Sequence, residues 1–196
     1  MDVITVYADS VTQVYICQLT EDLSQNDFLT EVELTEISAL QHLQRKKEYL
    51  TIRYILREIG ITDSIFYSGQ KPHLSNDMHL SISHNANYAG LAISKTPCGL
   101  DIERISERAF RVRDKYLTAK EKQLAMDDVM LHNLFWSVKE AVYKWDNSHV
   151  DFRETIQILA IDKMHQTVHV NTKHGEKTLN YRVTKDGDVV SWVVGE

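Results

Sequence analysis

The sequence predicts an α+β protein made of two packed halves, and three observations lead to this prediction. Segments of strand length alternate with helical segments, and in each half the order is strands, then helix, then strands. The chain has 196 residues, enough for one domain with a substantial core or for two small halves packed together. Its 43% hydrophobic and 26% charged residues are typical of a folded globular protein. We expect the halves to be residues 1–97 and 98–196, divided near Pro97.

The first half is expected to contain two strand pairs and one long helix. Short apolar runs bounded by turn formers indicate strands, and they cover residues 3–7, 11–19, 80–84 and 88–94. An apolar set at helical spacing predicts one helix over residues 35–59. Gly60 is expected to end it, because glycine accepts the left-handed conformation that follows many helices.

The second half is expected to begin with a strand, continue with helices and end with strands. Residues 99–103, GLDIE, alternate apolar and acidic side chains as a strand does. Thr118 and Glu121 form a capping-box signature that predicts the start of a helix, and a further helix is predicted over residues 131–145. From residue 155 onward, apolar and polar residues alternate in runs of strand length, with Asp186-Gly187 as a hairpin turn.

The charge, the cysteines and the absence of long apolar runs restrict the function. A net charge of −6 argues against non-specific binding to nucleic acid or to an acidic membrane, both of which need a basic surface. Cys17 and Cys98 are far apart and in no metal-ligand spacing, which favours reduced thiols. The N-terminus lacks the features of a signal peptide, and no apolar run approaches the roughly 20 residues of a membrane-spanning helix. We therefore expect a soluble, cytoplasmic protein.

Asp101 and Glu103 are the first candidate functional residues. Alternate residues of a strand point to the same face, so the two carboxylates are expected about 6.6 Å apart at the backbone. Like charges this close raise each other's pKa unless a cation separates them. One interpretation is the wet face of an ordinary sheet. The other is a divalent cation site, for which Mg²⁺ with oxygen ligands and substrate phosphate is suitable.

The helix predicted over residues 131–145 carries the next candidates. Its apolar stripe consists of Leu131, Leu134, Phe135, Val138, Ala141, Val142 and Trp145. At about 100° per residue, Glu140 falls nearly opposite the centre of that stripe. Lys144 lies one turn further on the side of Glu140, and Lys139 flanks the stripe. A Glu–Lys pair at this spacing is also a common device for stabilising an exposed helix.

Two further segments carry groups that bind phosphate. Lys71-Pro72 is part of a rigid turn, and the strand SISH ends in the hydroxyl of Ser83 and the imidazole of His84. The blocks KP, SISH, GLDIE and WSVKEAVYK occur in the order found in the 4′-phosphopantetheinyl transferase superfamily, and the chain resembles that family over residues 53–144. Its length and layout resemble the surfactin-synthetase-activating type, which implies a monomer.

The resemblance implies a fold, a reaction and a set of site residues. The family consists of a pseudo-two-fold pair of similar α/β halves, each a small, mainly antiparallel sheet packed with helices, with the ligand cleft between them. Its members transfer 4′-phosphopantetheine from coenzyme A to a serine of an acyl or peptidyl carrier protein, with Mg²⁺, and release adenosine 3′,5′-bisphosphate. The implied Mg²⁺ ligands are Asp101, Glu103 and Glu140, with Glu140 and Lys144 as catalytic residues. The implied coenzyme A contacts are Arg53, Lys71, Ser83, His84, Lys139 and Lys144.

The chain departs from the family pattern at three places. Gln70 separates Gly69 from Lys71, where the family has Gly-Lys-Pro without interruption. Asn85 follows Ser-His, where the family has a second serine. The segment WDNSHVDF after Lys144 lacks the usual glycines. None of these changes removes an implied metal ligand or Lys144.

A basic segment follows GLDIE and has two interpretations. It contains Arg104, Arg108, Arg111, Arg113 and Lys115, interspersed with Glu107 and Asp114. It forms either a solvated, salt-bridged surface or a docking site for an acidic helix of the carrier protein.

Two other functions remain open from the sequence. A Mg²⁺-dependent hydrolase would use the same carboxylates with water as the acceptor, and a non-catalytic member would bind coenzyme A or a partner without turnover. A zinc-protease site is rejected, because Gln166 occupies the position of the essential glutamate between His165 and His169. The alternation around these histidines predicts a strand instead of the helix that such a site needs.

Overall fold

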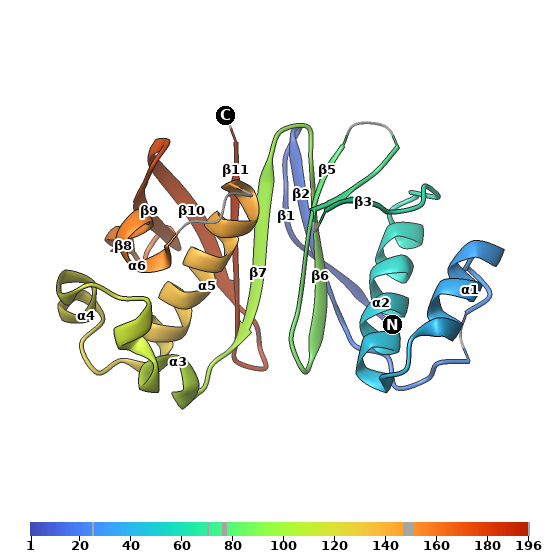
Figure 1. The fold of residues 1–196 in the computed structure, drawn as a ribbon, viewed down its shortest axis with the longest axis horizontal. Helices are drawn as coiled ribbons and strands as arrows, with labels where there is room; N and C mark the ends of the chain where they lie inside the picture. Colours follow the sequence, from blue (N-terminus) through green and yellow to red (C-terminus); the bar gives the residue numbers. More distant parts are fainter. Residues whose placement is uncertain (25, 70, 76–77, 147–150, 196) are drawn as a thin grey trace.

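Two antiparallel sheets form the centre of the molecule and face each other (Figure 1). The structure is a computed structural model and describes residues 1–24, 26–69, 71–75, 78–146 and 151–195. Helices pack on the outer face of each sheet, so the layers run helices, sheet, sheet, helices. This arrangement confirms the predicted α+β class with two similar halves.

The first sheet has the strand order β1-β2-β6-β5-β4-β3. Its strands are β1 (Val3–Ala8), β2 (Thr12–Gln18), β3 (Phe66–Ser68), β4 (Lys71–His73), β5 (His79–His84) and β6 (Tyr88–Ser94). The long helix α2 (Leu43–Glu58) packs on this sheet through Ile52, Ile55 and Leu56, which are buried against Leu80 and Leu91. The expected strand pairs are therefore present, and β3 and β4 add a short hairpin.

The prediction of one helix over residues 35–59 was wrong. The segment contains α1 (Glu31–Ala39) and α2, separated at Leu40, whose backbone is extended with φ −70° and ψ 127°. A capping box starts α1, with the Thr30 hydroxyl accepting from the Glu33 backbone and the Glu33 carboxylate accepting from the Thr30 backbone. This Thr-x-x-Glu signature is visible in the sequence and marks the true helix start.

The second sheet has the strand order β7-β11-β10-β9-β8. Its strands are β7 (Cys98–Arg104), β8 (Gln157–Asp162), β9 (Thr167–Thr172), β10 (Gly175–Val183) and β11 (Asp188–Val194). The intervening helices are α3 (Glu107–Arg111), the 3₁₀ turn η1 (Arg113–Lys115), α4 (Ala119–Ala125), α5 (Val129–Asp146) and α6 (Phe152–Thr155). The Thr118–Glu121 capping box starts α4 as predicted. His169 lies on β9 and not on a helix, which agrees with rejection of a zinc-protease site.

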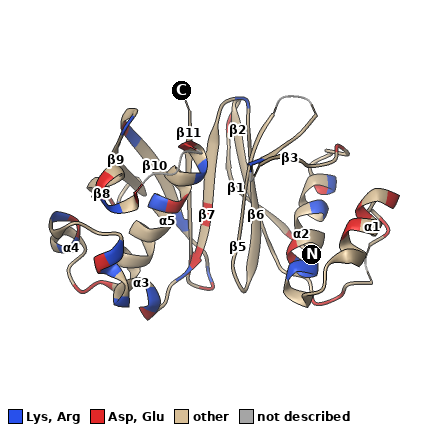
Figure 2. Cartoon of the chain, viewed as in Figure 1, with Lys and Arg blue, Asp and Glu red and all other residues tan. Residues whose placement is uncertain are grey.

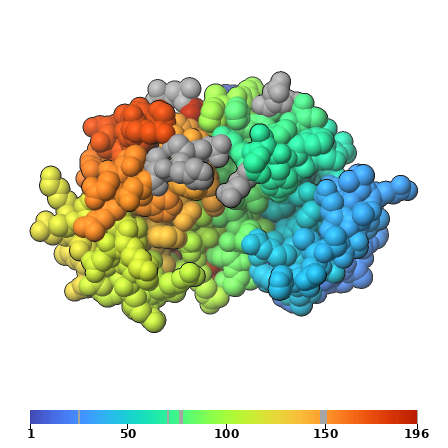
Figure 3. Space-filling model, in the orientation of Figure 1, coloured from blue at the N-terminus to red at the C-terminus, as the bar shows by residue number. Residues whose placement is uncertain are grey.

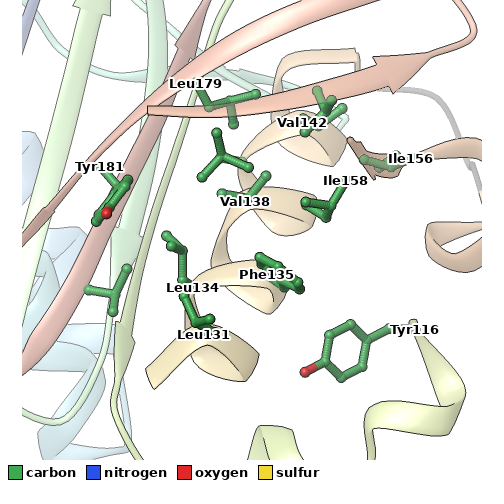
Figure 4. Close-up of a cluster of buried hydrophobic side chains, with 14 of the residues drawn as sticks. Tyr116, Leu131, Leu134, Phe135, Val138, Val142, Ile156, Ile158, Leu179 and Tyr181 are labelled. Atoms are coloured by element: carbon green, nitrogen blue, oxygen red, sulfur yellow. The ribbon is translucent and has the colours of Figure 1, made fainter. Parts of the chain in front are cut away.

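Helix α5 is the central helix of the second half. Its apolar stripe packs on the sheet, with Leu134, Val138 and Val142 beside Leu179 and Tyr181 of β10 (Figure 4). The opposite side of the same sheet faces the first half. The helix is therefore held firmly on one side, and its other side can present polar groups.

A third apolar cluster joins the two sheets. It contains Val14, Ile16, Tyr88, Ala92, Cys98, Leu100, Ile102, Val190 and Trp192. Gly90 of β6 allows this close approach, because a Cβ atom there would lie 2.6 Å from Cδ1 of Ile102. The two sheets therefore share one core instead of being joined by a flexible linker.

Both cysteines are free and buried. Burial raises the pKa of the Cys17 thiol to about 11 and that of the Cys98 thiol to about 12. Within the described ranges, no helix combines the length and the apolar character needed to cross a membrane.

Candidate functional site

A cleft lies between the two halves, bordered by β5, β7 and α5 (Figure 3). It consists of two adjoining cavities of about 760 and 540 Å³, which share His84, Glu140 and Lys144. The larger cavity contains Asp101 and Glu103. The smaller one is lined by side chains of the first half, including Arg45, Tyr67, Lys71 and Pro72.

The serines of SISH connect the two sheets at this cleft. Strand β7 is at the edge of its sheet, so alternate backbone N–H groups of β7 need partners elsewhere. The Leu100 N–H donates to Ser81 Oγ at 2.9 Å, and the Ile102 N–H donates to Ser83 Oγ at 3.1 Å. The two serines lie on one face of β5 because they are two residues apart. Ser83 therefore lies in the cleft next to Asp101, as a structural bridge between the halves.

Asp101 has one well-bound oxygen and one oxygen without a partner. Its Oδ1 accepts from Ser83 Oγ at 3.0 Å and from Lys144 Nζ at 2.9 Å. Its Oδ2 is buried and has no hydrogen-bond partner among the described residues. A buried carboxylate oxygen left unpaired is costly, so this atom is suited to bind a cation.

Glu103 and Glu140 are held close to Asp101 in a partly dry environment. Burial, followed by the charges of Asp101 and Glu140, raises the pKa of Glu103 to about 7. A 3.0 Å hydrogen bond from Trp136 Nε1 to Glu103 Oε1 opposes this rise. Burial, followed by the charge of Asp101, raises the pKa of Glu140 to about 7. The three carboxylates repel one another, which is the condition that a divalent cation relieves.

Gly99 explains how α5 brings Glu140 and Lys144 to β7. A Cβ atom at Gly99 would lie 1.9 Å from the backbone oxygen of Ala141 and 2.8 Å from the backbone nitrogen of Trp145. Only glycine allows the helix to pass this close to the strand. Lys144 then reaches both Asp101 and the Leu100 carbonyl, at 2.9 Å each. The glycine of GLDIE is therefore required by helix packing.

The carboxylate oxygens of Asp101, Glu103 and Glu140 are suitable ligands for a divalent cation, but their positions in this structure do not surround a single ion site. Among the described residues, no three His, Cys, Asp or Glu side chains form a group ready to hold a metal. The ammonium of Lys144 provides the positive charge beside Asp101 in this structure. The unpartnered Asp101 oxygen and the raised pKa values of the two glutamates nevertheless match the oxygen-rich site that Mg²⁺ prefers.

The opposite wall of the cleft is basic and comes from the first half. His84 Nδ1 lies 3.2 Å from Glu48 Oε1, and His84 Nε2 lies 3.0 Å from an Arg45 nitrogen. Burial lowers the pKa of His84, partly offset by the charge of Glu48. Arg45 was not predicted from the sequence. The only signal for Arg45 in the sequence is its place in the basic run RKK at the start of α2. Its contact with His84 depends on how distant segments pack, which local sequence patterns do not predict.

Arg53 and Lys139 do not line the cleft. Arg53 points to α1, where its Nε lies 3.2 Å from Glu33 Oε1 and its guanidinium lies over the Tyr49 ring. Lys139 is fully buried, and its Nζ lies 2.8 Å from Glu121 Oε1. The Lys139 ammonium also donates to the carbonyls of Tyr116 and Phe152. In this structure their charged groups are enclosed by protein partners, and the expectation that both residues touch the cofactor stays a prediction.

The residues of the basic segment after GLDIE lie in different environments. Arg108 and Lys115 line the larger cavity, whereas Arg104 donates to Asn87 Oδ1 and Arg113 lies over the Phe110 ring. Two of the departures from the family pattern, Gln70 and the segment 147–150, lie outside the described residues. The third, Asn85, is described and bonds across the two halves.

Comparison with known proteins gives an independent result. A family model described as the 4′-phosphopantetheinyl transferase superfamily matches residues 97–194, half of the chain. The chain is 29% identical over 106 residues to the 4′-phosphopantetheinyl transferase gsp of Aneurinibacillus migulanus, and the aligned part covers 50% of this chain and 45% of that protein. The chain thus spans about half the length of the curated relative that it matches. The matched residues 97–194 include β7 and α5, the two elements that carry the carboxylates.

Proposed function

The chain belongs to the 4′-phosphopantetheinyl transferase superfamily, and from this premise we propose that it transfers 4′-phosphopantetheine from coenzyme A to a serine of an acyl or peptidyl carrier protein. The observation that carries the proposal is the meeting of three carboxylates and Lys144 at one cleft, with Asp101 Oδ2 buried and unpartnered among the described residues. A diphosphate donor needs positive charge there, and carboxylates suit such a site only with a cation between them and the phosphates.

The two halves have different tasks in this proposal. Residues 1–97 bind the nucleotide end of coenzyme A, chiefly with Lys71, His84 and Arg45 on the basic wall. Residues 98–196 provide Asp101, Glu103 and Glu140, which would hold Mg²⁺. When bound, the ion neutralises charge on the diphosphate oxygens. Lys71 and Arg45 supply charge-assisted donors to phosphate oxygens, which are stronger than neutral ones.

The chemistry of the transfer requires one base and one cation from the chain. Glu140 lines the larger cavity and is proposed to accept the proton of the carrier serine. The serine oxygen forms a bond to the phosphorus that carries pantetheine. The anhydride P–O bond breaks, and adenosine 3′,5′-bisphosphate leaves with the electron pair. Lys144 orients the diphosphate and stabilises the charge on the leaving oxygen.

The test is incubation of an apo-carrier with coenzyme A and Mg²⁺, followed by mass spectrometry of the carrier. We expect a gain of one phosphopantetheine, prevented by EDTA and reduced about 10²–10⁴-fold in rate by Glu140→Gln, which cannot accept the proton. Glu176→Gln, an exposed change on β10, is the matched control and should leave the rate unchanged. Cleavage of coenzyme A without any carrier would favour a hydrolase, and no modification of any carrier would favour a binding protein.

The carrier is proposed to dock beside the larger cavity, at the basic residues Arg104, Arg108, Arg111 and Arg113, as a partner of a monomeric enzyme. Opposite charges at the rim of an interface accelerate association more than they add affinity. The double change Arg111→Glu with Arg113→Glu should therefore raise the KM for the carrier and leave the KM for coenzyme A unchanged. An unchanged KM for the carrier would remove this docking site.

A further inference from the structure

Two of the polar contacts between the halves meet at Asp188, the first residue of β11. The Asn85 side chain donates to Asp188 Oδ1 at 2.7 Å, and the Asn87 side chain donates to Asp188 Oδ2 at 3.2 Å. Asp188 is 0% exposed. Both asparagines lie in the turn between β5 and β6, in the other half of the molecule. The two oxygens of one buried carboxylate are thus bound by amides from across the interface.

The direction of the Asn85 amide is fixed by its own turn. Asn85 Oδ1 accepts from the backbone N–H of Asn87 at 2.8 Å and from that of Tyr88 at 2.9 Å. These two bonds leave the Nδ2 group to face Asp188, so a rotated amide would lose three hydrogen bonds. The backbone of Asp188 is also held at the turn before β11, because the Asp188 N–H donates to Thr184 Oγ1 at 3.0 Å.

This contact lies directly beside both walls of the cleft. Asn85 follows His84, which lines both cavities of the cleft. Asp188 pairs with Arg104 at the end of β7, and the next pair along the ladder is Val189 with Glu103. The hydrogen bond between Asn85 and Asp188 therefore connects the neighbour of His84 on one wall to the strand pair that holds Glu103 on the other.

We propose that Asn85 and Asp188 form a clamp that sets the separation of the two walls, and that Asn85 is a positioning residue for binding of the nucleotide donor. The clamp itself is argued from the structure alone, and its effect on the donor rests on the proposed function. A donor that contacts both walls binds only those protein molecules in which the walls are correctly spaced. Its apparent affinity therefore falls in proportion to the fraction of molecules in that arrangement.

The first experiment measures backbone hydrogen exchange without any ligand. The amides of Leu100 and Ile102 bond to the serines of β5, so their exchange reports contact between the halves directly. Asn85→Asp places a second carboxylate against Asp188 and should accelerate exchange of both amides about tenfold or more, because each factor of ten needs only about 1.4 kcal/mol. Asn171→Asp, the same chemical change at an exposed position of β9, should leave these amides unchanged.

A double variant in which the two side chains trade places distinguishes loss of the clamp from a general loss of folding. Asn85→Asp combined with Asp188→Asn restores one amide and one carboxylate in reversed positions, so the turn bonds and the bridging hydrogen bond can form again. We expect exchange of Leu100 and Ile102 within about twofold of the wild-type protein in this double variant. Equal acceleration in the double and the single variant would overturn the proposal, as would wild-type exchange in Asn85→Asp.

The second experiment measures transfer kinetics with coenzyme A as the probe. Asn85→Ser removes the amide with little risk to folding and should raise the KM for coenzyme A about threefold to tenfold, with kcat and the KM for the carrier within about twofold. A purely structural role would lower the active fraction, and so kcat, at unchanged KM, which would overturn the role in donor binding. Absence of transfer in the wild-type protein would refute the proposed function, whereas the exchange data would still confirm or refute the clamp.

Discussion

The two walls of the cleft differ in the charged groups that they contribute. The wall of the first half has Arg45, Lys71 and His84, whereas that of the second half has three carboxylates and Lys144. Figure 2 shows acidic positions on β7 and basic positions on α2. On the basic wall, Glu48 is paired with both Arg45 and His84, so part of the charge is already compensated. On the wall of the second half, the acidic wall, three carboxylates lie near Lys144, and Arg108 and Lys115 line the same cavity. In the proposed function, the first half binds the anionic groups of the donor and the second half binds a cation.

The largest expected effect comes from the acidic wall. Asp101→Asn keeps the size of the side chain but removes the charge beside the unpartnered Oδ2 atom. We expect kcat/KM for phosphopantetheine transfer to fall about 10²–10³-fold or more, because charge stabilisation at the reacting phosphate depends on this carboxylate. Asp127→Asn, at an exposed position before α5, is the control. Transfer at the wild-type rate in Asp101→Asn would show that the wall does not serve a cation.

The basic wall is expected to act on binding more than on chemistry. Lys71→Ala and Arg45→Ala should each raise the KM for coenzyme A about tenfold, since a lost charge-assisted hydrogen bond costs about 1.5–3 kcal/mol. Their kcat should change much less than that of Asp101→Asn. Steady-state kinetics with varied coenzyme A and saturating carrier measure both constants. Equal losses of kcat on the two walls would contradict the division of tasks.

Substitution of Lys139 tests whether this lysine of α5 contributes only to stability and not to binding of coenzyme A. Lys139→Met removes the partner of the buried Glu121 and two carbonyl contacts. Breaking a buried ion pair by removing one partner costs about 3–5 kcal/mol, so chemical denaturation should reveal a large loss of stability. Below the unfolding transition, the KM for coenzyme A should remain that of the wild-type protein. A raised KM with unchanged stability would return Lys139 to the cofactor site.

The smallest expected effect is the pH dependence of stability in the absence of metal. Folding raises the pKa of both Glu103 and Glu140 from 4.5 to about 7, so the folded protein binds more protons than the unfolded chain between these values. The free energy of unfolding should therefore decrease as the pH rises from about 4.5 to about 7. Thermal unfolding across this range measures the slope. Mg²⁺ at pH 8 should raise the melting temperature, and Glu103→Gln with Glu140→Gln should remove both effects.

Much of the fold and the centre of the site were predictable from the sequence. The strand GLDIE, the capping box at Thr118 and the long helix with Glu140 are local patterns, and local patterns report local structure. The break between α1 and α2 was missed because the apolar spacing continues across Leu40, although the Thr30–Glu33 capping box marks the earlier helix.

The other differences between the expected and the observed environments concern contacts between distant segments. Arg53 was expected in the site and Arg45 was not, since the rotation of α2 relative to β5 decides which arginine meets His84. Lys139 lies at the edge of the apolar stripe, where helical spacing alone does not distinguish burial from exposure. The bond between Asn85 and Asp188 joins residues 103 positions apart, and no periodicity in the chain reports it.

The buried cysteines have a practical consequence for work with a thiol-bearing donor. Because Cys17 and Cys98 are enclosed and protonated at neutral pH, neither should react with the disulfide of coenzyme A or with maleimide probes. Two cysteines, one introduced at the surface of each half, would then be the sites of labelling. Distance measurements between labels on the two halves could follow binding of the donor and of the carrier without first replacing the native cysteines.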